Sequence, residues 1–344
     1  MMYTTTTALK KTRLQRALGI ALFGSIALGA SGMLSANWQE HLTISGHVAI
    51  DAVYEKMEEE NYSDLIISGA GLHFAAEIAE NVTADIAFYY EDGYDHPDLD
   101  EATISFNLGG GPLTFVAGRT YLPFGDFSSN MVSDPITLAM GEIREDALLL
   151  NMEMEGLYGS VYLFNGDIEK YDANDTLSNY GLRLGYHWDQ GDTSLDMGVD
   201  WINSIYDTDG IEWALNELYG TNTVFKRISG LGAHIHGRYG PFSLYTGYVG
   251  ATDDLAGKGT NTQARAWNLE AGYDFLIGDM DATVALGYQE STEAAMLELP
   301  EKRISGAVSM EVANHTTLAF EYRRDTGYDR EKSHAGIAQV AVEF

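Results

Sequence analysis

Six basic residues occupy polar positions within stretches that alternate between apolar and polar side chains: Arg183, His234, His236, Arg238, Arg303 and Arg323. Arg183, for example, lies between Leu182 and Leu184. Neighbouring side chains of an extended strand point to opposite faces, so these bases would share one face of a sheet. Arginine binds carboxylates through two parallel hydrogen bonds. Such a face would favour an anionic solute.

The same bases have a simpler role, because each could pair with an acidic residue on the same face. The acidic residues at corresponding positions are Asp196, Asp200, Glu270, Asp274, Glu311 and Glu321. For any single base we favour this pairing over direct contact with a solute. Both interpretations require the strands to enclose a polar interior.

The residue types give little support for metal binding, thiol chemistry or catalysis. His234 and His236 are two positions apart, but a metal site needs further ligands, so we expect no metal there. The chain has no cysteine, which excludes disulfides and thiol nucleophiles. No arrangement of nucleophile, base and acid stands out. We therefore expect neither an enzyme nor a cofactor.

The first 36 residues have the layout of a secretory signal. Lys10, Lys11, Arg13 and Arg16 precede an apolar run over 18–28, and small residues follow up to Ala36. The apolar run is shorter than the roughly 20 residues of a membrane-spanning helix. We expect cleavage within 30–36, after Ala36 in the first instance. The sequence thus predicts an exported protein.

Removal of these four basic residues takes the formal net charge from −31 to −35. Nucleic-acid binding requires Lys and Arg side chains that neutralise phosphates, so this acidity argues against nucleic acid as a partner. The remaining 308 of 344 residues, 37–344, contain no apolar run of spanning-helix length. Because lipid accepts only helices and closed sheets, a membrane role would require a barrel.

Alternation with a period of two residues recurs from residue 42 to the end of the chain. In 193–203, for instance, Leu195, Met197 and Val199 alternate with Asp196 and Gly198. This pattern predicts strands with one apolar and one wet face. About sixteen strands are expected: 42–54, 65–78, 82–90, 101–108, 113–121, 145–153, 157–165, 179–188, 193–203, 228–239, 242–251, 265–275, 281–290, 302–312, 316–324 and 334–344.

The connections between these strands alternate between short turns and long acidic loops. Turns such as Gly240-Pro241 contrast with loops such as 91–100, 122–144 and 204–227. This alternation places all turns at one rim and all loops at the other, which is the layout of outer-membrane barrels. A sandwich with Greek-key crossings has no reason to sort its loops in this way. The predicted fold is an all-β, transmembrane, antiparallel up-and-down barrel.

Two further patterns support a Gram-negative outer membrane. Aromatic residues such as Tyr54, Trp188 and Trp267 stand near strand ends on the apolar face, as in the aromatic girdles at the two headgroup levels. The closing segment 338–344 alternates and ends in Phe344, which resembles the signal read by barrel-assembly machinery. We expect this machinery, lipid and lipopolysaccharide as partners, and association of several copies stays open.

A sixteen-stranded barrel has a lumen wide enough for water. A 22-stranded transporter also carries a plug, and 308 residues cannot supply both, so no plug domain is expected. The long loop 122–144 is the candidate constriction. It is richer in apolar residues than the other loops and includes Phe124, Phe127, Met131, Asp134 and Pro135. We favour a loop folded into the lumen over one that packs on a neighbouring protomer.

The segment from Gly118 to Gly125 reads GRTYLPFG, and residues 130–138 read NMVSDPITL. These motifs resemble the signature segment of the LbtU-type siderophore porins. The Pro-Phe-Gly part also resembles phosphate-type porins. The resemblance implies a plugless sixteen-stranded barrel that takes up a ferric polycarboxylate siderophore without an inner-membrane energy transducer. It implies no particular binding residue in this chain.

Three hypotheses follow for the function. The first is uptake of a ferric siderophore, and the second is a general or small-anion-selective diffusion porin. The third is a barrel enzyme or adhesin, which the lack of a catalytic arrangement disfavours.

Overall fold

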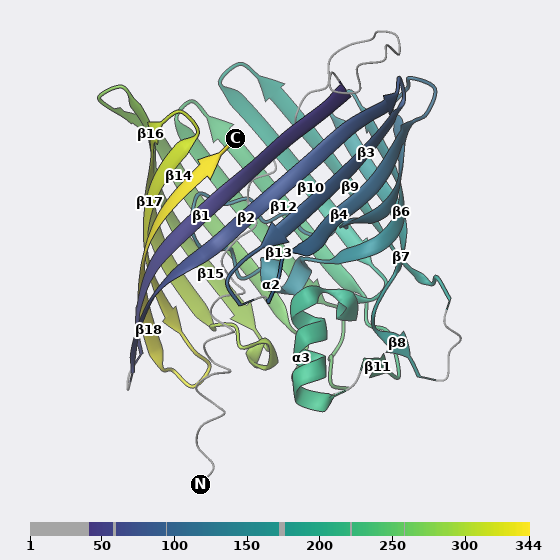
Figure 1. Ribbon diagram of the computed structural model, residues 1–344. Helices are drawn as coiled ribbons and strands as arrows, with labels where there is room; N and C mark the ends of the chain where they lie inside the picture. Colours follow the sequence, from purple (N-terminus) through teal and green to yellow (C-terminus); the bar gives the residue numbers. More distant parts are fainter. Residues whose placement is uncertain (1–40, 58–59, 94, 172–175, 221, 258) are drawn as a thin grey trace.

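The computed structural model describes residues 41–344 apart from 58–59, 94, 172–175, 221 and 258. The predicted signal segment, 1–36, lies outside these residues. Sixteen antiparallel strands form one closed barrel (Figure 1). Each strand pairs with the next along the chain, and the first also pairs with the final one. The predicted up-and-down barrel of about sixteen strands is confirmed.

The barrel strands lie within a few residues of the predicted ranges. Their bounds are β1 Leu42–Lys56, β2 Asn61–Ala79, β3 Val82–Tyr90, β4 Asp98–Asn107, β5 Leu113–Tyr121, β6 Arg144–Met154, β7 Leu157–Asn165, β9 Asn179–Gln190, β10 Thr193–Ile202, β12 Gly230–Tyr239, β13 Phe242–Ala251, β14 Arg265–Ile277, β15 Met280–Thr292, β16 Lys302–Ala313, β17 Thr316–Thr326 and β18 Lys332–Glu343.

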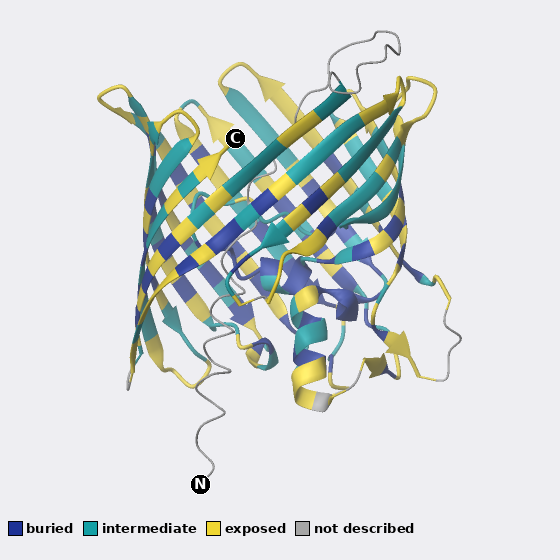
Figure 2. Ribbon diagram, viewed as in Figure 1, coloured by how far each residue is buried: buried dark blue, intermediate teal, exposed yellow. Residues whose placement is uncertain are grey.

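The alternation of side chains gives the barrel an apolar outer face and a polar inner face. On β9, Leu182 and Leu184 are 43% and 50% exposed on the outside, whereas the side chain of Arg183 between them is 17% exposed. Figure 2 shows the same pattern of buried and exposed residues along neighbouring strands. Strands with one apolar face become stable in lipid because closure satisfies all their backbone groups.

The connections are sorted between the two rims, as the sequence predicts. Short turns, such as 155–156 between β6 and β7 and 240–241 between β12 and β13, lie at the upper rim of Figure 1. The longer segments lie at the lower rim. Gly156 has φ 85°, and an added Cβ would lie 2.2 Å from the His187 carbonyl oxygen, so this turn requires glycine.

The long segments carry structure of their own that the sequence did not lead us to expect. It comprises helix α2 Leu138–Gly141, 3₁₀ helix η3 Ile205–Asp207, helix α3 Asp209–Tyr219, 3₁₀ helix η4 Ala295–Leu297, and a parallel pair of two-residue strands, β8 Glu169–Lys170 and β11 Thr223–Val224. No helix among the described residues is both long and apolar enough to cross a membrane.

A hydrophobic core fills part of the barrel at the long-loop end. Helix α3 buries Ile211 and Ala214 completely, and these residues join a cluster that includes Phe124 and Met140 of the segment between β5 and β6. The backbone N–H of Asp209 donates to the Glu142 carbonyl oxygen at 3.0 Å. Several of the long segments therefore pack together against the inward-folded segment.

Candidate functional site: the lumen and its inward-folded loop

The segment 122–143, between β5 and β6, lies inside the barrel. We call it the lumen loop. Its apolar residues Leu122, Phe124, Met140 and Ile143 are buried in the hydrophobic core. Its backbone N–H groups donate hydrogen bonds to carboxylate and amide oxygens of side chains that project inward from strands much later in the sequence. The lumen loop is therefore attached to the wall along most of its length.

The first attachment is made by a charged pair on β9 and β10. Arg183 and Asp200 face each other, with Arg183 Nε 2.6 Å from Asp200 Oδ1. The N–H of Gly125 donates to Asp200 Oδ2 at 2.9 Å, and Arg183 Nη2 donates to the Gly125 carbonyl oxygen. One ion pair thus satisfies both polar groups of Gly125. Gly125 also has φ 80°, which favours glycine.

The second attachment is the carboxylate of Glu270 on β14. It accepts hydrogen bonds from Ser129 Oγ at 2.6 Å, from the Asn130 backbone N–H at 2.7 Å and from Asn130 Nδ2 at 2.7 Å. Glu270 is 4% exposed. Hydrogen bonds to an ionised acceptor are stronger than neutral ones, so this carboxylate fixes two successive residues of the loop.

The third attachment holds the middle of the lumen loop, which is its tip inside the barrel, against β16 and β17. Glu321 accepts from the backbone N–H of Ser133 at 2.7 Å and from its hydroxyl at 2.5 Å. Arg303 Nη1 donates to the Asp134 carbonyl oxygen at 3.3 Å. Val132 packs against Val53, Ile66 and Ile337 of β1, β2 and β18. The loop therefore reaches the wall that closes the barrel.

All five residues predicted for the constriction lie inside the barrel. Phe124 is 1% exposed and Asp134 is 7% exposed, and Pro135 is also buried. Phe127 and Met131 are partly buried, and Phe127 packs against the hydrophobic core.

Three of the predicted lumen arginines are paired with carboxylates. Arg183 pairs with Asp200, and Arg238 Nη1 lies 2.6 Å from Asp274 Oδ2. Arg303 donates from Nε and Nη2 to the two oxygens of Asp325, at 2.9 and 3.0 Å. Of the acids that the sequence suggested as partners, Asp200 and Asp274 hold arginines, whereas Glu270 and Glu321 hold the lumen loop instead.

The two histidines of β12 also have acidic neighbours. His234 Nε2 lies 2.8 Å from Asp196 Oδ1 and 3.1 Å from the Tyr158 hydroxyl. His236 Nε2 lies 3.4 Å from Asp126 of the lumen loop. The described residues contain no group of three or more His, Cys, Asp and Glu side chains that could hold a metal ion.

Arg323 on β17 differs from the other bases. Its Nε lies 3.8 Å from Asp325 Oδ2, beyond hydrogen-bond distance, because Arg303 already takes both oxygens of that carboxylate. Arg323 is 4% exposed, and its Nε and Nη1 atoms have no hydrogen-bond partner in the structure. A buried charge without a full partner is costly unless water or a ligand supplies one.

Acidic residues gather between helix α3 and the strands β5 to β7. A polar cavity of about 210 Å³ is lined by Arg119, Arg144, Glu145, Asp146, Asn165, Asp167, Asp209 and Glu212. Burial raises the pKa of Glu212 to about 7, with further contributions from Asp167, Asp209 and Asp207. Burial likewise raises the pKa of Glu142 well above its ordinary value, and Asp209 adds to the effect.

The sequence of this barrel also matches a known protein family. Residues 20–330 match the model of the family described as Gram-negative porin. The chain belongs to this family. The closed sixteen-stranded barrel agrees with this membership.

This porin is also similar to curated proteins of two bacteria. A UPF0422 protein of Legionella pneumophila (strain Lens) is 27% identical over 307 residues, which cover 81% of this chain and 56% of that protein. A UPF0422 protein of Coxiella burnetii is 26% identical over 239 residues, 67% of this chain and 51% of that protein. The porin thus spans about half the length of these relatives.

Solved structures share the fold of this porin at low sequence identity. OprB of Pseudomonas putida has a TM-score of 0.65 at 7% identity and covers 89% of this chain and 95% of its own. DcaP of Acinetobacter baumannii has a TM-score of 0.60 at 15% identity, with 88% and 97% covered. An anion-selective porin from Comamonas acidovorans has a TM-score of 0.59 at 10% identity, with 88% and 99% covered.

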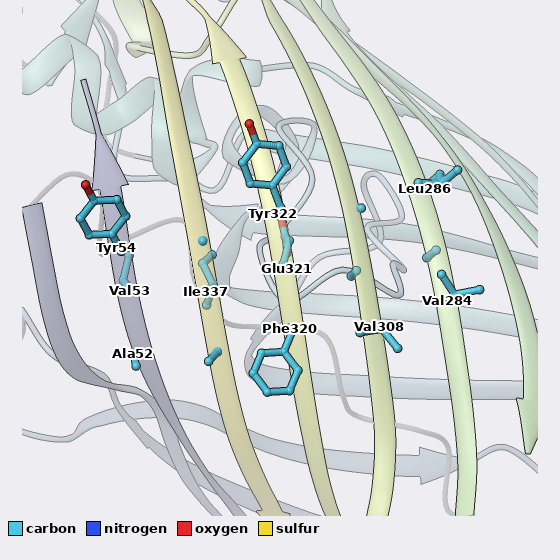
Figure 3. A pocket seen from close by; sticks show the side chains of 15 residues that line it. Ala52, Val53, Tyr54, Val284, Leu286, Val308, Phe320, Glu321, Tyr322 and Ile337 are labelled. Carbon is cyan, nitrogen blue, oxygen red and sulfur yellow. The ribbon is translucent and has the colours of Figure 1, made fainter. Parts of the chain in front are cut away.

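The outer surface of this porin carries a shallow apolar groove of about 630 Å³ over β15–β18 and β1 (Figure 3). Val284, Leu286, Phe320 and Tyr322 border it, and Tyr54 lies at its far side on β1. These side chains alternate with inward residues such as Arg323 and Arg303, so the groove lies on the lipid side of the wall. The groove does not open into the lumen.

Proposed function

We propose that this porin is a solute-selective diffusion channel whose narrowest part lies between the lumen loop and the barrel wall. The observation that carries this proposal is the attachment of the lumen loop at three carboxylates, Asp200, Glu270 and Glu321. A loop fixed in this way narrows the lumen permanently, whereas an exposed loop would leave it open. Passage would then depend on the size and charge of the solute.

Single-channel recording in planar bilayers tests this proposal. The full-length porin should conduct ions, and deletion of 126–140 should raise its conductance because the lumen then loses its obstruction. Removal of Phe127 alone by substitution to alanine provides a smaller change in the same loop and should give an intermediate rise. An unchanged conductance after the deletion would show that the loop does not narrow the channel.

Uptake of a ferric polycarboxylate siderophore is the more specific hypothesis, and it rests on the resemblance of 118–142 to siderophore porins. The motif Ser133-Asp134-Pro135 coincides with the far attachment of the lumen loop, where Ser133 binds Glu321. The hypothesis is tested by uptake of labelled ferric siderophore in a deletion strain, with and without the porin gene restored. Equal uptake in both strains would remove it.

Selectivity for small anions is the rival hypothesis. The solved structure from Comamonas acidovorans with the same fold is described as anion-selective. Within the present lumen, however, the carboxylates of Asp200, Asp274 and Asp325 neutralise Arg183, Arg238 and Arg303. The reversal potential in a salt gradient distinguishes the cases, because an anion-selective channel gives a potential of opposite sign to that of a cation-selective one.

A further inference from the structure

One row of inward positions crosses the wall that closes the barrel. Ser305 of β16 faces Arg323 of β17, Arg323 faces Ala335 of β18, and Ala335 faces Glu55 of β1. Neighbouring strands are about 4.8 Å apart, so the Cα atoms of Arg323 and Glu55 are separated by roughly 10 Å. The residue between them in this row is Ala335, whose side chain is a single methyl group. We call this row the closing-wall notch.

The polar atoms of this notch lack partners. Arg323 Nε and Nη1, Glu55 Oε2 and Ser305 Oγ make no hydrogen bond in the structure. All three residues are more than nine-tenths buried, with exposed fractions of 4%, 3% and 3%. Buried polar groups are nearly always hydrogen-bonded, and exceptions require an explanation such as an absent ligand or water. Here two guanidinium nitrogens and one carboxylate oxygen without hydrogen bonds flank the same small residue.

The neighbouring rows do not share this property, because they are already occupied. On one side Arg303 is bound to Asp325 and to the lumen loop at Asp134. On the other side Glu321 is bound to Ser133, and Val132 covers Val53 and Ile337. The tip of the lumen loop therefore lies on both sides of the notch. A molecule in the notch would be at the level of the constriction.

We propose that the closing-wall notch binds zwitterionic solutes of the α-amino-acid class, with the carboxylate at Arg323 and the ammonium group at Glu55. The guanidinium offers two free donors for a carboxylate, and Glu55 offers a free acceptor for an ammonium group. The two charges of an α-amino acid flank a single carbon, and in the notch the small residue Ala335 lies between the two unpaired groups. The inference rests on the proposed channel function and names its solute class.

The experiment uses the full-length porin in planar bilayers and three probes of nearly equal size. L-Alanine carries both charges, L-lactate lacks the ammonium group, and L-alaninamide lacks the carboxylate. We expect alanine to reduce the open-channel current at a concentration at least tenfold lower than lactate or alaninamide. Equal potency of the three probes would overturn the inference.

Substitutions then assign each charge to its residue. Arg323→Gln should weaken the effect of alanine at least tenfold, to that of alaninamide, and Glu55→Gln should weaken it to that of lactate. The matched control is Arg324→Gln, because Arg324 is exposed and adjacent in sequence but on the opposite face. This substitution should not change the concentration at which alanine reduces the current. A control that weakens alanine as much as Arg323→Gln, or notch variants that do not weaken it, would contradict the inference.

The outcome also separates this inference from the proposed function. Wild-type protein and both notch variants should show heat-modifiable migration and conduct potassium chloride, which establishes folded channels. A wild-type protein without any conductance would overturn the channel proposal and the notch with it. A conducting wild-type channel that does not distinguish alanine from lactate would overturn the notch alone.

Discussion

Arg183 and Asp200 face each other on neighbouring strands and together hold both polar groups of the Gly125 peptide. The side chain of Asp200 is fully buried, and that of Arg183 is 17% exposed. A pair of this kind is strong only while both partners are present, because either one alone leaves a buried charge. The first of the three attachments of the lumen loop therefore depends on this ion pair.

Asp200→Asn should destabilise the porin by about 3 kcal/mol, since it leaves Arg183 without its counter-charge. The matched control is Asp274→Asn. The pair of Asp274 with Arg238 is about 33% and 47% exposed, so its loss should cost less than about 1 kcal/mol. The midpoint of unfolding, followed by heat-modifiable migration, measures both. Equal shifts for the two variants would contradict the assignment of Asp200 as an anchor.

Glu321→Ala should free the tip of the lumen loop, because both hydrogen bonds from the buried Ser133 are lost. We expect a higher conductance with larger fluctuations of the open current. Ser133→Ala removes one of the two bonds and should have a smaller effect. Glu311→Ala, an exposed inward residue of β16, serves as the control. The expectation is wrong if Glu311→Ala matches Glu321→Ala.

Gly118→Ala should prevent normal barrel assembly. Gly118 of β5 has φ 137°, and an added Cβ would lie 2.0 Å from the Ala102 carbonyl oxygen of β4. Backbone atoms of a paired strand cannot move aside, and the φ value adds strain of about 1–3 kcal/mol. Gly237→Ala on β12 meets no atom within 4 Å and should be tolerated. The yield of heat-modifiable protein in outer-membrane fractions compares the two variants.

The packing of α3 should weaken as the pH rises. The pKa of Glu212 is raised from 4.5 to about 7, chiefly by burial, so its charged form is less favourable in the folded state than in the unfolded one. Stability from this group is therefore greatest below pH 4.5 and is lost as the pH rises through about 7. Asp207, with a pKa raised by burial to about 6, acts in the same direction.

Hydrogen-exchange protection factors of 209–218 measure this effect. They should be higher at pH 5 than at pH 8, and Glu212→Gln should reduce the difference. Glu217→Gln, an exposed residue of the same helix, should leave the difference unchanged. An equal response to the two substitutions would show that burial of Glu212 is not the cause.

The barrel was predictable because strands with one apolar and one wet face alternate with a period of two residues, and because the sorting of short turns and long loops distinguishes a barrel from a sandwich. Leu182, Arg183 and Leu184 show this in three residues. Helix α3 was missed because its apolar residues Ile211, Ala214 and Leu215 are few and stand among acids, although their spacing of three and four is helical. The roles of Glu270 and Glu321 were not predictable, since their partners are 140 and 188 residues away and depend on the path of the loop.

The pairing of β1 with β18 is the seam of the cylinder, where Phe344 N–H donates to the Gly46 carbonyl oxygen at 3.0 Å. Every other ladder of the barrel joins strands that are consecutive in the barrel order, but this one joins the first strand to the last. Until it forms, two rows of unpaired peptide groups face the hydrocarbon, which tolerates neither. Translation of β18 is therefore a precondition for insertion, and a polypeptide truncated before it would retain nearly all the alternation yet have no stable place in the bilayer.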